Sequence, residues 1–134
     1  MYCLDTNIII FFLKNNSPRL IEKFWLEYEN SFICTTSITA AELLYYSYKN
    51  KATKSLKNRK EFLQTMQILD FDFMSADIYA FQKAELANSG NIVDDLDLQI
   101  ASICISNRLI LATNNTKDFE RINDLQIEDW TQEK

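Results

Sequence analysis

The sequence contains no histidine, only one glycine and only one proline among its 134 residues. The absence of histidine excludes a Cys/His zinc site, a Ser-His-Asp triad and a histidine general base. Any catalysis must therefore depend on carboxylates, lysines, hydroxyls or a bound metal ion. With only Gly90 and Pro18 available, most turns must be formed by Asn, Asp, Ser and Lys residues.

The sequence also lacks the long apolar run, of about 20 residues, that a helix needs to cross a bilayer. The segment Met1–Asp5 has no basic flank and makes a poor signal peptide, so we expect a cytoplasmic protein without membrane contact. Cys3, Cys34 and Cys104 each lie in an apolar stretch. An odd number of cysteines without a close pair argues against a disulfide framework, and we expect buried free thiols.

The length and the 47% apolar content are typical of one globular domain, residues 1–134. The formal net charge of −5, taken alone, argues against a phosphate-bearing partner. The charge is unevenly distributed, however. Six of the fourteen basic residues form one short segment: Lys49, Lys51, Lys54, Lys57, Arg59 and Lys60. The C-terminal end is acidic, with Glu120, Asp124, Glu128, Asp129 and Glu133. Nucleic acid could therefore approach one side of the molecule.

Short apolar segments alternate with segments of helical spacing along the whole chain. Strands are predicted at residues 1–4, 32–35, 68–71, 109–112 and 125–127. Helices are predicted at residues 8–13, 18–28, 37–44, 56–66, 75–87, 95–105 and 117–121. This alternation favours an α/β layer fold with a central, mainly parallel β-sheet flanked by helices. In such sheets, sites form outside the carboxyl ends of the strands.

Four carboxylates are candidates for a site at that edge of the sheet. Asp5 follows the first strand, and Glu42 lies in the second turn of the helix that follows residues 32–35. Asp118 follows the strand at residues 109–112, and Asp97 lies beside the apolar face of the helix at residues 95–105. Each acid also has a plain structural interpretation: a helix cap for Asp5, a favourable charge at a helix N-terminus for Asp97, and an exposed position on a helix for Glu42 and Asp118.

The neighbouring acids Asp94 and Asp95 are better interpreted as caps and favourable charges at a helix N-terminus. Carboxylates that converge at one edge of a sheet repel one another, and a hard divalent cation relieves that repulsion. Mg²⁺ or Mn²⁺ takes oxygen ligands and keeps bound waters, so few protein carboxylates suffice. One or two such ions can activate water against a phosphoryl group without histidine.

At this point the chain resembles the PIN-domain ribonucleases, and specifically the VapC toxins of bacterial toxin–antitoxin pairs. The resemblance covers the whole chain in the family's order and ends at Glu128-Asp129-Trp130. The matching segments are Leu4-Asp5-Thr6-Asn7, Ser37-Ile38-Thr39-Ala40-Ala41-Glu42-Leu43, Asp95-Leu96-Asp97-Leu98-Gln99-Ile100-Ala101 and Thr113-Asn114-Asn115-Thr116-Lys117-Asp118-Phe119.

The resemblance implies a PIN-like three-layer fold and Mg²⁺- or Mn²⁺-dependent cleavage of RNA. The implied metal-binding and catalytic residues are Asp5, Glu42, Asp97 and Asp118. Asp5 and Asp97 would be direct ligands, whereas Glu42 would bind the metal directly or through water. The implied supporting residues, which would orient the acids or the scissile phosphate, are Thr6, Asn7, Thr113 and Asn115. The tail resembles toxins that attack tRNA, an analogy that leaves the identity of the RNA open.

The sequence departs from many PIN domains at Asn115, where those domains carry an acid. Asp118 would have to supply the fourth carboxylate, which leaves one or two metal ions as open alternatives. The resemblance also implies a homodimer and a VapB-like antitoxin that inserts a basic side chain into the acidic site.

The basic segment is either a solvated pair of helices or a contact with the RNA backbone. Tyr45, Tyr46 and Tyr48 precede it and could stack on bases or lie in an interface with a second copy or an antitoxin. A second functional hypothesis is a catalytically weak or inactive PIN-like module that binds RNA or protein. A receiver or an Asp-x-Asp phosphatase is disfavoured, because Asp5 stands alone and Asn7 occupies the position of the second acid.

Overall fold

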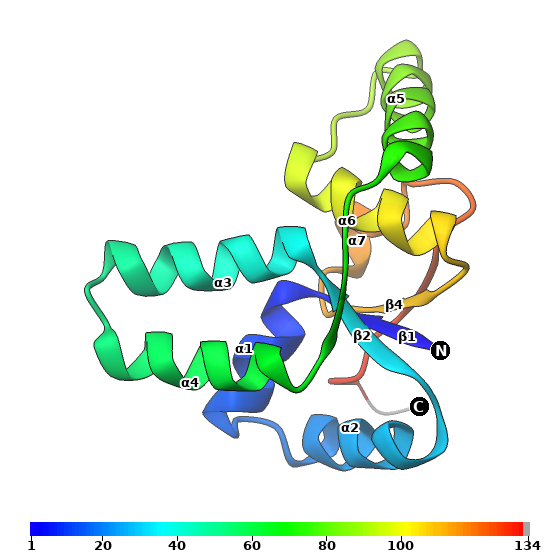
Figure 1. The fold of residues 1–134 in the computed structure, drawn as a ribbon. Coiled ribbons are helices and arrows are strands. Elements are labelled where there is room, and N and C mark those ends of the chain that lie inside the picture. The colour runs from blue at the N-terminus through cyan, green and yellow to red at the C-terminus, as the bar shows by residue number, and fades with distance from the viewer. Residues whose placement is uncertain (133–134) are drawn as a thin grey trace.

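The computed structural model describes residues 1–132, in which five strands and seven helices alternate along the chain (Figure 1). The strands are β1 (Tyr2–Leu4), β2 (Ile33–Thr36), β3 (Gln67–Leu69), β4 (Ile110–Ala112) and β5 (Gln126–Glu128). The helices are α1 (Thr6–Lys14), α2 (Pro18–Asn30), α3 (Ser37–Lys49), α4 (Thr53–Gln64), α5 (Phe73–Asn88), α6 (Asp95–Ser106) and α7 (Thr116–Phe119). Glu133, the last member of the predicted acidic end, lies outside the described residues.

The five strands form one sheet in the order β3-β2-β1-β4-β5, and every neighbouring pair is parallel. The prediction of an α/β fold with a mainly parallel sheet is therefore confirmed. The strand order reverses beside the central strand β1, and such a switch point opens a crevice at the carboxyl ends of the strands. There Leu4 pairs with Ala112, and the backbone amide of Asp5 donates a 2.9 Å hydrogen bond to the carbonyl of Ala112.

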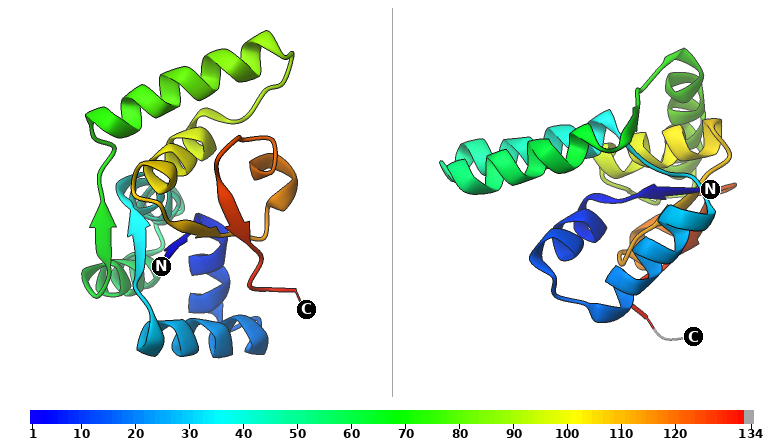
Figure 2. Two further views of the ribbon diagram at one scale, coloured as in Figure 1. Left: turned by 90° about the vertical axis from the view of Figure 1, so that its right-hand side faces the viewer. Right: turned by 60° about the horizontal axis from the view of Figure 1, so that its bottom comes forward.

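Alternation of side chains along the strands divides the core between the two faces of the sheet. Cys3 and Leu111 pack on one face with residues of α5, α6 and α7. Leu4 and Ala112 pack on the other face with residues of α1, α2, α3 and α4. The sheet and its two helical coverings make three layers, as predicted (Figure 2). All three cysteines are free and buried, which confirms that expectation.

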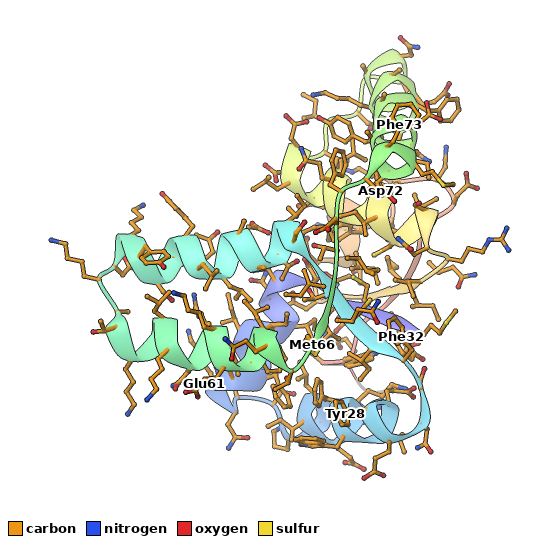
Figure 3. The ribbon with its side chains drawn as sticks, viewed as in Figure 1. Tyr28, Phe32, Glu61, Met66, Asp72 and Phe73 are labelled. Carbon is orange, nitrogen blue, oxygen red and sulfur yellow. The ribbon has the colours of Figure 1, made fainter. Side chains whose placement is uncertain are left out.

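Short polar side chains fix where most of the helices begin. Asp5 caps α1, Ser17 caps α2 ahead of Pro18, and Thr36 caps α3. The predicted start of α5 at Ser75 is wrong, because the side chain of Asp72 accepts a 2.9 Å hydrogen bond from the Ser75 amide. The helix therefore starts two residues earlier than predicted, directly after Asp72 (Figure 3).

Helices α3 and α4 form an antiparallel hairpin that projects from the sheet, and α5 projects on the other side of α6 (Figures 1 and 2). The hairpin is held together by a 2.7 Å hydrogen bond from Arg59 Nη1 to the Leu43 carbonyl. The hydroxyls of Ser47 and Ser55 also lie 3.3 Å apart across it. Among the described residues, every helix is too short or too polar to cross a membrane.

Candidate active site

Asp5 lies at the carboxyl end of β1 and is 5% exposed. Its Oδ1 accepts a 2.8 Å hydrogen bond from the Thr6 amide, so it serves as the cap of α1. Its Oδ2 accepts a second 2.8 Å hydrogen bond from the hydroxyl of Thr113, at the end of β4. Burial raises the pKa of Asp5, and these two hydrogen bonds offset part of that rise. The residue is thus both a cap and an oriented acid.

Glu42 projects from the second turn of α3 toward the start of α1. Its Oε1 accepts a 2.8 Å hydrogen bond from the hydroxyl of Thr6, which also lies 3.3 Å from the hydroxyl of Thr39. Partial burial raises the pKa of Glu42, the Thr6 hydrogen bond lowers it, and the nearby charges of Asp5 and Asp94 raise it further. The prediction of a merely solvated helix face does not fit these contacts.

Asp97 lies in the first turn of α6 and is partly buried. Burial, as the main cause, and nearby negative charges together raise the pKa of Asp97 to about 7. The charges that contribute belong to Asp5, Asp94, Glu42 and Asp118. Because each of these acids acts on Asp97, the fold has brought together carboxylates that are far apart in the sequence.

The two neighbours of Asp97 differ from one another in their roles. Asp94 caps α6 by accepting hydrogen bonds from the amides of Leu96 and Asp97, at 3.2 and 3.4 Å. Its charge nevertheless reaches Glu42 and Asp97, which the sequence-based interpretation as a simple cap missed. Asp95 does not cap the helix, but it lies in the first turn of α6 as the predicted favourable charge and forms an exposed 2.9 Å ion pair with Lys83.

The loop after β4 contains the position where the sequence departs from many related domains. The side-chain amide of Asn115 donates a 3.1 Å hydrogen bond to Asp118 Oδ2. The backbone amide of Asn115 donates to the hydroxyl of Thr113 at 2.9 Å. Thr113 therefore links Asn115 to Asp5, and Asn115 holds Asp118 beside the cluster instead of supplying a charge. Asn7 is exposed, and within residues 1–132 we find no hydrogen bond from its side chain to these acids.

The donor set suits a hard, hydrated cation better than a dry metal cage. All candidate donors are carboxylate oxygens, and the raised pKa values of Asp5, Glu42 and Asp97 reflect the cost of their ionised forms. Across residues 1–132, no three acidic or thiol side chains are grouped as ligands of one ion. Mg²⁺ needs only one or two direct carboxylates because it retains several waters. The residues thus fit such an ion bound largely through water.

The basic segment and the acids occupy different parts of the molecule. Three of its members, Lys51, Lys54 and Arg59, line a cleft at the tip of the α3–α4 hairpin. Lys49 and Lys60 lie over the rings of Tyr45 and Tyr48. The remaining member, at position 57, is exposed on α4.

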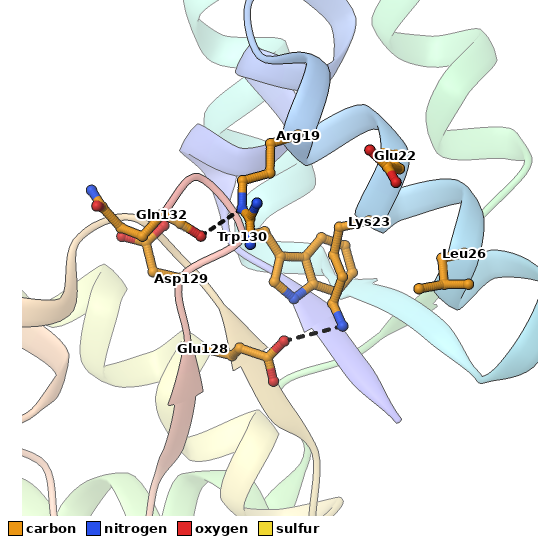
Figure 4. A pocket seen from close by; sticks show the side chains of 8 residues that line it. All are labelled: Arg19, Glu22, Lys23, Leu26, Glu128, Asp129, Trp130 and Gln132. Atoms are coloured by element: carbon orange, nitrogen blue, oxygen red, sulfur yellow. Dashed lines mark hydrogen bonds and ion pairs between the residues drawn. The ribbon is translucent and has the colours of Figure 1, made fainter. Parts of the chain in front are cut away.

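A separate hollow lies between α2 and the chain that follows β5 (Figure 4). It has a volume of about 270 Å³ and is crossed by a 3.4 Å ion pair between Lys23 and Glu128. The indole ring of Trp130 forms one wall. Since its described lining includes none of the four candidate acids, we do not assign the chemistry to it.

The fold and its acidic edge define a PIN domain, since the sequence model of that domain matches residues 2–125. The chain is 37% identical over 131 residues to the tRNA(fMet)-specific endonuclease VapC of Shigella flexneri, covering 97% of this chain and 98% of the relative. It is 34% identical over 130 residues to ribonuclease VapC2 of Haemophilus influenzae, covering 96% and 97%. The chain belongs to the PIN-domain family, among its VapC proteins.

Solved structures agree with this assignment. A chain in the crystal structure of VapBC2 from Rickettsia felis, bound to a DNA fragment from its promoter, matches with a TM-score of 0.89 and 33% identity. That match covers 96% of this chain and 98% of the other. A chain of DNA-bound VapBC from Salmonella typhimurium matches with a TM-score of 0.89 and 37% identity, covering 96% and 97%.

Proposed function

We propose that this protein is a metal-dependent endoribonuclease, the toxin of a toxin–antitoxin pair. The observation that carries the proposal is the convergence of four carboxylates on Asp97, whose pKa is about 7. Perturbed carboxylates gathered at the carboxyl edge of a parallel sheet are typical of a functional site. The endonuclease and ribonuclease names of its relatives support RNA as the substrate, and tRNA in particular.

Asp5, Glu42, Asp97 and Asp118 would hold Mg²⁺ or Mn²⁺, with Asp5 and Asp97 as direct ligands. When bound, such an ion lowers the pKa of a coordinated water and stabilises charge on the phosphoryl group. Thr113 keeps one Asp5 oxygen oriented, and Thr6 does the same for Glu42. Asp5 is nearly fully buried, which helps to keep its side chain in one position.

Cleavage of a total tRNA pool, with Mg²⁺ and with excess EDTA, tests this function. We expect discrete products in Mg²⁺, none in EDTA, and renewed cleavage when Mn²⁺ is added to the chelated protein. The same products in EDTA would contradict the role of the metal. Intact RNA under all conditions, with a folded protein free of antitoxin, would contradict the activity. Sequencing of the new 5′ ends would identify the RNA and the cleavage position.

The second candidate is a PIN-like module that binds RNA or protein and cuts weakly or not at all. It is favoured by one observation: Asn115 stands where an acid would complete a denser metal site, and it holds Asp118 by a hydrogen bond. This candidate predicts that Asp5→Asn and Asp97→Asn leave toxicity in cells unchanged. The endonuclease predicts that both substitutions abolish toxicity.

We also infer a VapB-like antitoxin partner and a homodimer. The antitoxin is supported by the VapBC complexes among the similar structures. The homodimer is supported by large apolar side chains on α5: Phe73, Met74 and Phe81 are 85%, 63% and 62% exposed. Light scattering of the isolated protein should give twice the mass of the chain, and Phe81→Asp should halve it. A monomeric wild type would contradict the dimer.

A further inference from the structure

The tip of the α3–α4 hairpin forms a cleft of about 530 Å³ against the last turn of α1. From α1 the cleft takes Ile10, Leu13 and Lys14. From the other side it takes the turn after α3 and the first turns of α4: Lys51, Ala52, Thr53, Lys54, Ser55, Asn58 and Arg59. The basic segment is recognisable in the sequence, but only the fold brings Lys14 to the same place.

All the charge in this lining is positive. Lys14, Lys51 and Lys54 are exposed at the rim, and Arg59 is held by its hydrogen bond to the Leu43 carbonyl. Among the described residues that line the cleft there is no carboxylate. The first turn of α4 adds the partial positive charge of a helix N-terminus. In a chain of net charge −5, such a concentration of cations selects an anionic occupant.

The cleft is joined to the acids by two helices that start at the candidate active site. Helix α1 begins beside Asp5 and ends in the cleft with Lys14, and its nine residues span roughly 14 Å. Helix α3 carries Glu42 and ends just before Lys51. On α3, Tyr46 lies four residues after Glu42 on the same helical face and is 42% exposed. A bound chain at the acids could thus continue past an aromatic side chain into the cleft.

An extended RNA strand fits the succession of acids, aromatic side chain and basic cleft better than an acidic peptide does. A strand that places its scissile phosphate at the acids has further phosphates a few nucleotides away, where the cations lie. The charge pattern of the protein, negative where metal would bind and positive beyond it, matches a single polyanion that needs metal at one point only. Tyr46 offers a base-stacking surface between the two points, which a peptide does not require.

We propose that this cleft binds the backbone phosphates of the RNA strand on one side of the cleavage point. The inference depends on the proposed ribonuclease function and specifies how that site holds its substrate. Lys14 and Lys54 are the residues that best test it, because both are exposed and neither side chain forms a hydrogen bond within residues 1–132. Arg59 is less suitable, since its replacement would also break the hairpin contact with Leu43.

The test compares Lys14→Gln/Lys54→Gln with the control Arg108→Gln. Arg108 is exposed at the amino end of β4, on the opposite edge of the sheet from the acids. With total tRNA and Mg²⁺, we expect the double variant to raise KM about tenfold while kcat changes little. The control should match the wild type in both constants.

Binding is measured in parallel by fluorescence anisotropy with a short labelled single-stranded RNA of mixed sequence, on an Asp97→Asn background. The plot of log affinity against log salt concentration should flatten by about 1.4 in the double variant, because each lost phosphate contact accounts for about 0.7. A second measurement tests affinity for the antitoxin, which we expect to be unchanged.

The possible failures are distinguishable. If the wild type cuts RNA and the double variant equals the Arg108→Gln control in KM and salt slope, the inference is wrong and the proposed function stands. If the double variant instead loses antitoxin affinity and keeps its salt slope for RNA, the cleft binds an acidic peptide and the inference is overturned. If the wild type neither binds nor cuts RNA, the proposed function itself fails.

Discussion

Replacement of Asp97 by Asn should make the metal-free protein more stable at neutral pH, although it removes a candidate catalytic group. Burial and four neighbouring negative charges raise the pKa of Asp97 from 3.8 to about 7. Between these two values the folded protein holds a proton that the unfolded chain has lost. This proton stabilises the folded state relative to the unfolded chain. The stabilisation is complete below the pKa of Asp97 in the unfolded chain, and it is lost as the pH rises through the pKa of Asp97 in the folded protein.

The size of the effect follows from the separation of the two pKa values. At 1.36 kcal/mol for each pH unit, the difference between 3.8 and about 7 sets an upper bound of about 4 kcal/mol. Asp97 is only partly buried, and water screens its interactions, so we expect about half of that bound, roughly 2 kcal/mol. Asparagine is neutral at every pH and retains nearly the same shape, so the variant should lose this dependence.

Urea denaturation of both proteins in EDTA, followed by circular dichroism between about pH 5 and pH 8, measures the difference. The free energy of unfolding of the wild type should fall over this range, and that of Asp97→Asn should fall much less. Asp77→Asn, an exposed substitution on α5, is the control and should follow the wild type. Mg²⁺ should remove most of the decline in the wild type. Parallel curves for the wild type and Asp97→Asn would refute the coupling of the acids.

Three further substitutions test the contacts around the acids and the core. Thr6→Val removes the 2.8 Å hydrogen bond to Glu42, so kcat for RNA should fall about tenfold. Thr6→Ser keeps the hydroxyl and should retain most activity. Equal rates for the two variants would contradict the positioning role of Thr6. Thr113→Val leaves a buried oxygen of Asp5 without its donor, so urea denaturation should show a loss of about 1–3 kcal/mol. Leu111→Ala opens a cavity at a fully buried position and should cost about 2–5 kcal/mol in the same assay without changing kcat per folded molecule.

Most of the fold could be predicted because local sequence signals agree with it. Ser17-Pro18 and Thr36 were predicted to begin helices, and in the structure Ser17 caps α2 and Thr36 caps α3. The segment boundaries were less certain where two polar residues compete for one helix start. The helix is capped by Asp72 and not by Ser75, because the carboxylate of Asp72 accepts a hydrogen bond from the amide three residues later. The spacing of the apolar residues does not distinguish these two helix starts.

The sequence was enough to select the candidate acids, but not the contacts between them and their neighbours. Asp5 and Asp118 could be selected because each follows a predicted strand. The strand order then places Asp5 beside the end of β4. The influence of Asp94 on Asp97 could not be selected, since a capping residue and a member of an acidic cluster have the same sequence signature. Lys14 was missed because its neighbours in the cleft lie about forty residues away in the chain.

The central claim is that Asp5 and Asp97 act in one metal site that cuts RNA. The most direct test is the single-turnover cleavage of a total tRNA pool in Mg²⁺ by the wild type, Asp5→Asn, Asp97→Asn and the exposed control Asp77→Asn, with folding of each checked by circular dichroism. We predict that Asp5→Asn and Asp97→Asn each lose at least about three orders of magnitude in rate, equivalent to about 4 kcal/mol of transition-state stabilisation, while Asp77→Asn cuts normally. Folded Asp5→Asn and Asp97→Asn proteins that cut at the wild-type rate would contradict the claim.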